Sequence, residues 1–185
     1  MRLIACLLAL LASPLAAQTP GTLRMTGEAR TGADQRAARF EFLCSSNARN
    51  ATGVLGVTFE LPRHETLAHV FDFNRFEGPD ADAGALTRLE SSPGAAGRFI
   101  VSGSIGVADD QPFVFGLYAA RRGDAAGLAA LGRVLRPLTL GAARLVWTQG
   151  NTRRGGPAIT ATLDVSAEDA GRLRTVLAPC LPAAR

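Results

Sequence analysis

The chain contains two histidines, and they are the first residues to examine for chemistry. His64 and His69 flank Glu65 in the pattern H-E-x-x-x-H, which is one residue longer than the zinc motif H-E-x-x-H. That motif places two histidines four residues apart on a helix so that both imidazoles face one metal. A spacing of five turns the side chains about 140° apart on a helix, and it puts them on opposite faces of a strand. The pattern therefore predicts surface or structural histidines and no metal site.

Other motifs that could carry catalysis or hold a cofactor do not appear in the sequence. The chain has no G-x-S-x-G turn for a nucleophilic serine, no Walker loop and no G-x-G-x-x-G. Asp80, Asp82 and Gly84 begin like a calcium loop. However, the oxygen ligand, glycine and glutamate that an EF-hand needs at its fifth, sixth and twelfth positions are missing. We therefore expect a protein that is not an enzyme and that has no cofactor.

The N-terminal segment has the composition of an export signal. Arg2 is followed by an apolar run over 3–11, which is too short to span a bilayer, and small residues precede Gln18. This pattern predicts a signal peptide over 1–17. Its removal would leave 168 of the 185 residues as a single domain, 18–185, in the periplasm or outside the cell.

The cysteines fit the same destination. Cys6 lies in the predicted signal peptide, so Cys44 and Cys180 would be the two cysteines of the mature chain. Disulfides persist in oxidising compartments outside the cytoplasm. We therefore expect one disulfide between Cys44 and Cys180, which would link the first part of the mature domain to its end.

The charge of the chain argues against nucleic acid as a partner. All 20 basic residues are arginine, with no lysine, which together with abundant alanine and glycine is typical of a GC-rich bacterial genome. The net charge is only +4, and acidic residues are interspersed throughout. The pairs Arg121-Arg122 and Arg153-Arg154 sit in predicted turns, where they could bind phosphate or carboxylate groups or be solvated. Beyond the signal, no stretch is long and apolar enough to span a membrane as a helix.

Alternation of apolar and polar residues predicts a mostly antiparallel β protein. The run 39–44 is the clearest, since Phe40, Phe42 and Cys44 share one face. We expect an α+β fold in which about seven or eight strands form a sandwich or a strongly bent sheet. The predicted strands cover 22–30, 39–44, 52–61, 69–73, 98–106, 113–118, 145–147 and 159–165.

Two segments have the period of a helix instead. Residues 124–136 place leucines at helical spacing and end at Pro137. Residues 166–178 begin with Ser166, a good N-cap, carry acids in the first turn and end at Pro179. We expect both helices to pack on the sheet, the second at the C-terminus.

The order of these elements resembles the small exported accessory proteins of the VasI and invasion-associated locus B type. The shared layout covers most of the mature chain. It implies a periplasmic β-rich protein that acts through protein contacts, and it transfers no catalytic residue. The layout consists of a strand ending in Cys44, further strands, a helix with Ala129-Ala130-Leu131 and Val134-Leu135, strands over 138–148 and 157–165, and a helix ending in Cys180.

Three functions are consistent with these observations. The first is a non-catalytic binding or accessory protein whose partner is a protein of the cell envelope. The second is a carrier of a small molecule or lipid, with an aromatic-lined cavity formed by Phe71, Phe73, Phe113 and Phe115. The third is a hydrolase with dispersed carboxylates, because paired carboxylates can come together only in three dimensions.

The loop around residue 78 is the candidate partner-binding segment. It combines an apolar anchor, Phe76, with Arg75 and the carboxylates of Glu77, Asp80 and Asp82. Loops displayed on a rigid sheet often carry function, and an aromatic anchor with a charged rim is typical of a protein interface. The alternative is a solvated turn whose Phe76 packs on the core.

Overall fold

The structure, a computed structural model, describes residues 21–47, 52–78, 81, 84–105 and 111–183. The predicted signal peptide lies outside these ranges, as do Asp80 and Asp82 of the candidate loop.

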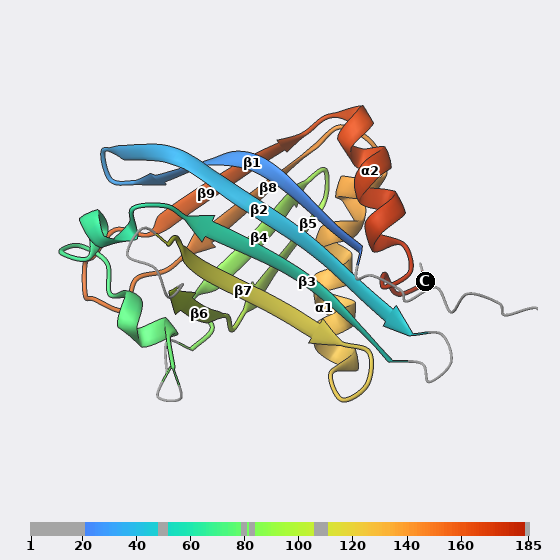
Figure 1. Ribbon diagram of the computed structural model, residues 1–185, viewed down its shortest axis with the longest axis horizontal. Coiled ribbons are helices and arrows are strands. Elements are labelled where there is room, and N and C mark those ends of the chain that lie inside the picture. Colours follow the sequence, from blue (N-terminus) through green and yellow to red (C-terminus); the bar gives the residue numbers. More distant parts are fainter. Residues whose placement is uncertain (1–20, 48–51, 79–80, 82–83, 106–110, 184–185) are drawn as a thin grey trace, which may run out of the picture.

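A single antiparallel sheet forms the body of the described chain, in the spatial order β5-β4-β8-β9-β1-β2-β3-β7-β6 (Figure 1). The α+β class is confirmed, and the sheet is one bent sheet of nine strands rather than seven or eight. The additional strands are short, and one of them, β4, lacked a strong apolar alternation. The strands are β1 (Gly21–Thr31), β2 (Asp34–Asn47), β3 (Thr52–Leu61), β4 (Thr87–Ser92), β5 (Ala95–Phe99), β6 (Ser102–Ile105), β7 (Phe113–Ala120), β8 (Ala143–Gln149) and β9 (Ile159–Val165).

The two edge strands of the sheet, β5 and β6, are neighbours in the chain. Only Ile100 and Val101 separate Phe99, the last residue of β5, from Ser102, the first of β6. Three Cα steps span at most about 11 Å, so the two edges meet at this corner and the sheet curls into a half-barrel (Figure 1). The single strand predicted over 98–106 is therefore wrong. Apolar alternation continued through the corner because Phe99 and Val101 are both buried.

Helix α1 (Ala125–Leu135) lies across the concave side of the curled sheet (Figure 1). It packs against β4 and β5 at one edge and against β7 and β3 near the other. Leu128, Leu131 and Leu135, whose spacing predicted the helix, are all buried. The Asp124 carboxylate caps the helix by accepting a hydrogen bond from the backbone N–H of Gly127 at 2.9 Å.

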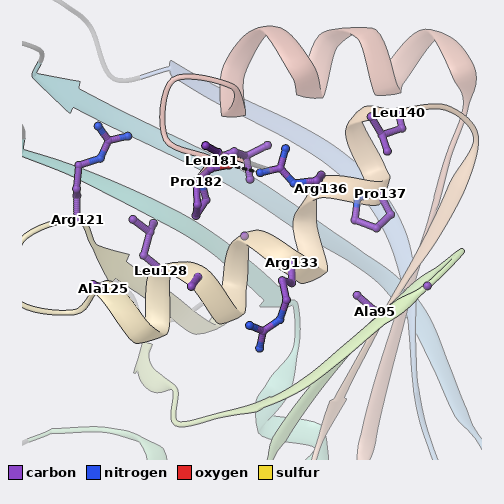
Figure 2. A pocket seen from close by; sticks show the side chains of 14 residues that line it. Ala95, Arg121, Ala125, Leu128, Arg133, Arg136, Pro137, Leu140, Leu181 and Pro182 are labelled. Atoms are coloured by element: carbon purple, nitrogen blue, oxygen red, sulfur yellow. Dashed lines mark hydrogen bonds between the residues drawn. The ribbon is translucent and has the colours of Figure 1, made fainter. Parts of the chain in front are cut away.

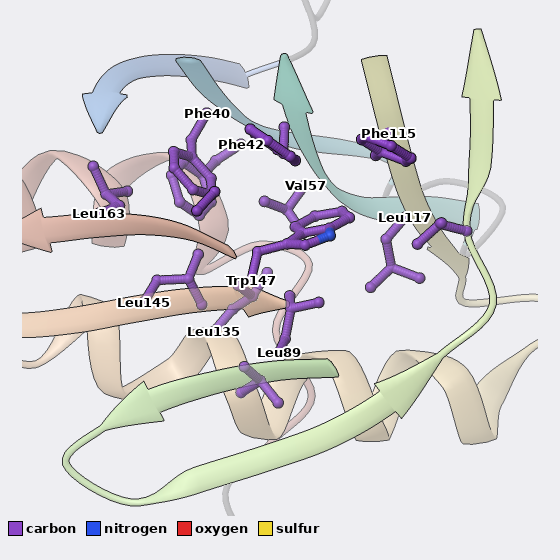
Figure 3. Close-up of a cluster of buried hydrophobic side chains, with 14 of the residues drawn as sticks. Phe40, Phe42, Val57, Leu89, Phe115, Leu117, Leu135, Leu145, Trp147 and Leu163 are labelled. Carbon is purple, nitrogen blue, oxygen red and sulfur yellow. The ribbon is translucent and has the colours of Figure 1, made fainter. Parts of the chain in front are cut away.

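Aromatic and aliphatic side chains fill the space between the sheet and α1 (Figure 3). Trp147 of β8 is fully buried, and its ring centroid lies 5.9 Å from that of Phe59 on β3. The buried Gln149 Oε1 accepts hydrogen bonds from the Thr87 hydroxyl at 2.6 Å and from the Trp147 indole at 3.3 Å. Because buried polar groups are costly without partners, this small network lets two polar side chains stay in the core.

Helix α2 (Ala167–Leu177) packs on β1 and β2 near one end of the sheet. The predicted cap is confirmed: the Ser166 hydroxyl accepts a hydrogen bond from the Asp169 N–H at 3.1 Å. After the helix, Cys180 bonds to Cys44 of β2, with the two Cα atoms 5.7 Å apart. The predicted disulfide is thereby confirmed, and it ties the C-terminal segment to β2.

Two short 3-10 helices occupy the segment between β3 and β4. They are η1 (His64–Leu67) and η2 (Phe73–Phe76), so the strand predicted over 69–73 is wrong. Phe73 and Phe76 stand three residues apart in η2, and a 3-10 helix has three residues per turn, so both rings face the core. A third 3-10 helix, η3 (Arg136–Thr139), follows α1, which is why the strand that the layout resemblance placed over 138–148 begins only at Ala143.

In the middle of the sheet, β1 from the start of the described chain pairs with β9 from near its end. This ladder pairs Glu28 with Thr162, Ala29 with Ala161 and Arg30 with Thr160. Gly27 lies beside it, and a Cβ at that position would come within 2.3 Å of the Thr162 carbonyl oxygen. Glycine is therefore required for the close approach of the two strands.

Candidate functional site

A groove of about 930 Å³ runs along one side of α1 (Figure 2). The helix residues that line it repeat at spacings of three and four, which places them on a single face. Most of them are small or aliphatic, so the floor is apolar. We call this hollow the α1 groove. The residues of α1 that line it are Ala125, Leu128, Ala129, Gly132 and Arg133, and Arg136 lines it just beyond the helix.

Segments distant in sequence form the ends and side of the α1 groove. Arg121, from the turn after β7, lies at one end, and Pro137 lies at the other (Figure 2). Leu181 and Pro182 of the C-terminal segment lie along the helix between them. Leu140 stands near the Pro137 end and is 71% exposed.

The C-terminal side of the groove is held in place by specific contacts. A Cβ on Gly132 would come within 2.6 Å of Pro182 Cδ, so the absence of a side chain lets the C-terminal segment approach the helix. The Arg136 guanidinium donates to the Pro182 carbonyl. Arg121 donates from Nη2 to the Pro179 carbonyl at 3.1 Å, and the Cys44–Cys180 disulfide anchors the same segment to β2.

The charged side chains among the described residues of the α1 groove are all positive. Three guanidinium groups line it, from Arg121, Arg133 and Arg136, and none of the described lining residues carries a carboxylate side chain. Arg133 is exposed and makes no hydrogen bond or ion pair with any other described residue. An apolar trough with guanidinium groups around it favours a ligand that joins an apolar part to an anionic group.

Two residues of the candidate partner-binding loop, Phe76 and Glu77, make contacts within the fold. Phe76 is only 1% exposed because its place in η2 turns the ring inward, so it packs on the core as the alternative interpretation expects. Glu77 pairs with Gly103 at the edge strand β6, and its carboxylate accepts a hydrogen bond from the Ile105 N–H at 3.0 Å. Glu77 thus covers part of a sheet edge. Arg75 lies in η2 and is exposed.

The aromatic-lined cavity expected for a carrier is filled by its own rings. The ring centroids of Phe71 and Phe73 are 4.8 Å apart, and those of Phe113 and Phe115 are 4.7 Å apart. All four side chains are at most 5% exposed. These rings fill the space that a carrier would need, because large aromatic side chains pack closely against one another. The α1 groove, of about 930 Å³, remains as a hollow that could receive a ligand.

The histidines and the second arginine pair lie outside the α1 groove. His64 packs between rings, with its centroid 5.2 Å from that of Phe73 and 5.6 Å from that of Phe113. Within the described ranges, no three His, Cys, Asp or Glu side chains gather as a metal site would require. Arg153 donates from Nη1 to the His69 carbonyl at 2.6 Å, so it fastens two loops together.

A second hollow, of about 540 Å³, lies where β1, β8 and β9 meet, and its charges neutralise one another. Arg144 Nε lies 2.6 Å from Asp164 Oδ1, and Arg30 Nε lies 2.7 Å from Glu28 Oε1. The hydrogen bond from Arg144 lowers the pKa of the Asp164 carboxyl below its usual range. Because both arginines already have carboxylate partners, this hollow is a weaker candidate than the α1 groove.

No protein-family model, curated protein sequence or solved structure matches this chain. Within the described ranges, neither α1 nor α2 nor any shorter helix has the length and apolar character to cross a membrane.

Proposed function

We propose that the chain is an exported, non-catalytic binding protein that carries a small amphipathic molecule in the α1 groove. The observation that carries this proposal is the combination of an apolar lining with three guanidinium groups and no carboxylate. The volume of the α1 groove, about 930 Å³, falls within the range of roughly 300–1,000 Å³ that is common for small-molecule sites.

The lining of the groove supports binding rather than catalysis. Among its described residues there is no Asp, Glu, His, Ser, Cys or Tyr. These are the groups that most often act as general acids, general bases and nucleophiles. Arginine and alkyl side chains instead hold and orient a ligand without exchanging protons with it.

Export rests on two features of the chain. The first 17 residues have the pattern of a cleaved signal peptide. The buried Cys44–Cys180 disulfide is the kind of bond that persists outside the reducing cytoplasm.

A protein partner in the cell envelope is the second candidate, and the exposed Leu140 favours it. An exposed leucine next to an apolar groove and flanking arginines could act as an apolar anchor with a charged rim. On this alternative the groove would receive an apolar side chain of the partner rather than a free small molecule.

A pair of tryptophan substitutions on α1 tests the proposal. Ala129→Trp would fill the groove, whereas Ala126→Trp places the same side chain on the same helix at an exposed position outside the lining. Both variants would be recovered from the exported fraction and compared by native mass spectrometry, with thermal melting to confirm folding. We expect a bound small molecule on the wild type and on Ala126→Trp, and none on Ala129→Trp.

The two candidates give different outcomes in that experiment. Loss of a co-purifying protein, rather than of a small molecule, in Ala129→Trp alone would support the second candidate. Identical ligand content in the two folded variants would show that the α1 groove is not the binding surface.

A further inference from the structure

We infer that the ligand of the α1 groove is a single-chain amphiphile with an anionic oxygen head group, and that Arg133 binds this head group. The inference rests on the proposed function and names the chemistry of its ligand.

Arg133 is the guanidinium in the groove with the most donors to offer. Arg121 and Arg136 each donate to a carbonyl of the C-terminal segment, at Pro179 and Pro182. Arg133 has no hydrogen-bond or ion-pair partner among the described residues, so all of its donors face solvent or a ligand. A guanidinium offers a planar fork that matches a carboxylate or phosphate with two parallel hydrogen bonds.

The rest of the lining fits an alkyl chain. Its side chains are aliphatic, mainly alanine, leucine and proline, and none is aromatic. Without a ring among the described lining residues, the groove has no platform for the base stacking by which nucleobases are recognised. A flexible alkyl chain, in contrast, gains from any apolar surface that it removes from water.

The position of Arg133 on the helix sets the direction of the ligand. Ala129 lies about one turn before Arg133 on the same face of α1, and Ala125 lies one turn further back. Leu128, five residues before Arg133, lies at the other edge of the lining. Leu181 and Pro182 lie alongside this part of the helix (Figure 2). A head group on Arg133 therefore leaves the alkyl chain to run along the apolar part of α1 towards Arg121.

The recessed shape of the lining favours a free molecule over a bilayer surface. Leu128 and Gly132 form part of the floor and are buried, so a ligand must enter the groove to reach them. Carboxylate and phosphate heads share the same recognition chemistry, and the experiment therefore includes both.

Displacement of phenylnaphthylamine, a neutral apolar fluorophore, from the purified mature protein tests the inference. The competitors are dodecanoate, dodecyl phosphate, methyl dodecanoate and dodecyltrimethylammonium, each below its micelle concentration and at low salt. We expect one or both anions to displace the probe at about fivefold lower concentration than the uncharged ester, the scale of an exposed ion pair. We expect the cation to be the weakest competitor.

Two arginine substitutions assign the head-group contact. Arg133→Gln should remove the advantage of the anions over the ester. Arg122→Gln, which removes the same charge from an exposed arginine outside the lining, should retain it. An equal preference in the two variants would overturn the role of Arg133.

The remaining outcomes separate this inference from the proposed function. If the probe binds and Ala129→Trp blocks it, but the ester or the cation competes as well as the anions, the head-group inference fails and the proposed function stands. If the probe does not bind, or Ala129→Trp does not affect it, both fail. Binding to phosphatidylglycerol vesicles without binding of monomeric anions would also overturn the inference, in favour of a membrane surface.

Discussion

Two regions of the half-barrel are packed in opposite ways. At one end, the rings of Phe71, Phe73, Phe76, Phe113 and Phe115 fill the interior, and we call this cluster the aromatic end. In the second region, alanines and a glycine of α1 line the α1 groove, and the groove stays open. Large rings close a space, whereas small residues on a helix face keep one available. The phenylalanines, the most conspicuous residues of the sequence, therefore serve stability, and the less conspicuous small residues of α1 form the candidate site.

The largest effect should come from emptying the aromatic end. Phe115 is fully buried and its ring lies within about 6 Å of several other rings. We expect Phe115→Ala to lower the free energy of unfolding by about 3–5 kcal/mol. Leu140→Ala, at the exposed rim of the α1 groove, should change it by less than about 0.5 kcal/mol.

Denaturant unfolding of both variants provides the measurement. Similar losses of unfolding free energy in the two variants would contradict this contrast between core and rim. Such a result would mean that the rim of the groove contributes to stability as the core does.

Loss of the disulfide should have the next largest effect on stability, and it should also weaken ligand binding in the α1 groove. The bond joins residues separated by 136 positions and holds the segment that lines the groove. The double variant Cys44→Ala, Cys180→Ala should lose about 2–5 kcal/mol of stability. It should also bind phenylnaphthylamine more weakly, because Leu181 and Pro182 are no longer anchored beside α1.

Chemical unfolding with and without reductant checks this prediction. Wild-type protein should lose stability on reduction, and the double variant should not respond. A wild type that is insensitive to reductant after complete reduction, shown by thiol alkylation, would contradict it.

The smallest effect concerns pH and the loop that leads into the aromatic end. Arg36 is buried and donates to the Pro62 and Arg63 carbonyls, while Asp34 receives two hydrogen bonds from its guanidinium at 2.6 Å each. These hydrogen bonds lower the pKa of Asp34 from its ordinary value of 3.8. A carboxyl with a lowered pKa stabilises the fold above its ordinary pKa, and the contribution disappears as the pH falls through the lowered value.

Asp34→Asn should therefore reduce stability near neutral pH by a small amount, since the carboxyl is exposed to solvent. The difference from wild type should shrink as the pH falls below 3.8. Thermal melting of both proteins across this range makes the comparison. A difference that stays constant to the lowest pH would exclude the ionised carboxylate as its source.

Much of the sheet could be predicted from alternation, because strands with one buried face repeat every two residues. That signal failed in the region around Phe71 and Phe73, where two rings also alternate but the chain turns into 3-10 helices. It also failed at Phe99 and Val101, which are both buried although a corner separates their strands. Alternation reports which residues face the core, and it does not report where a strand bends or ends.

The disulfide could be predicted because only two of the three cysteines lie outside the predicted signal peptide. The α1 groove could not, since its lining comes from four parts of the chain that meet only in the fold. One signal was present within α1 itself. Ala125, Ala129 and Gly132 repeat at helical spacing, which marks a face with little to pack against.

The short ladder between β1 and β9 has a consequence for how the protein is made. β1 can pair with β2 as soon as both strands have emerged, but its other edge must wait for β9, which lies near the end of the chain. During that time an unpaired strand edge is open to other chains, which is a recognised route to aggregation. The charged side chains of Arg24, Glu28 and Arg30 on β1 would protect this edge until β9 is available to pair with it.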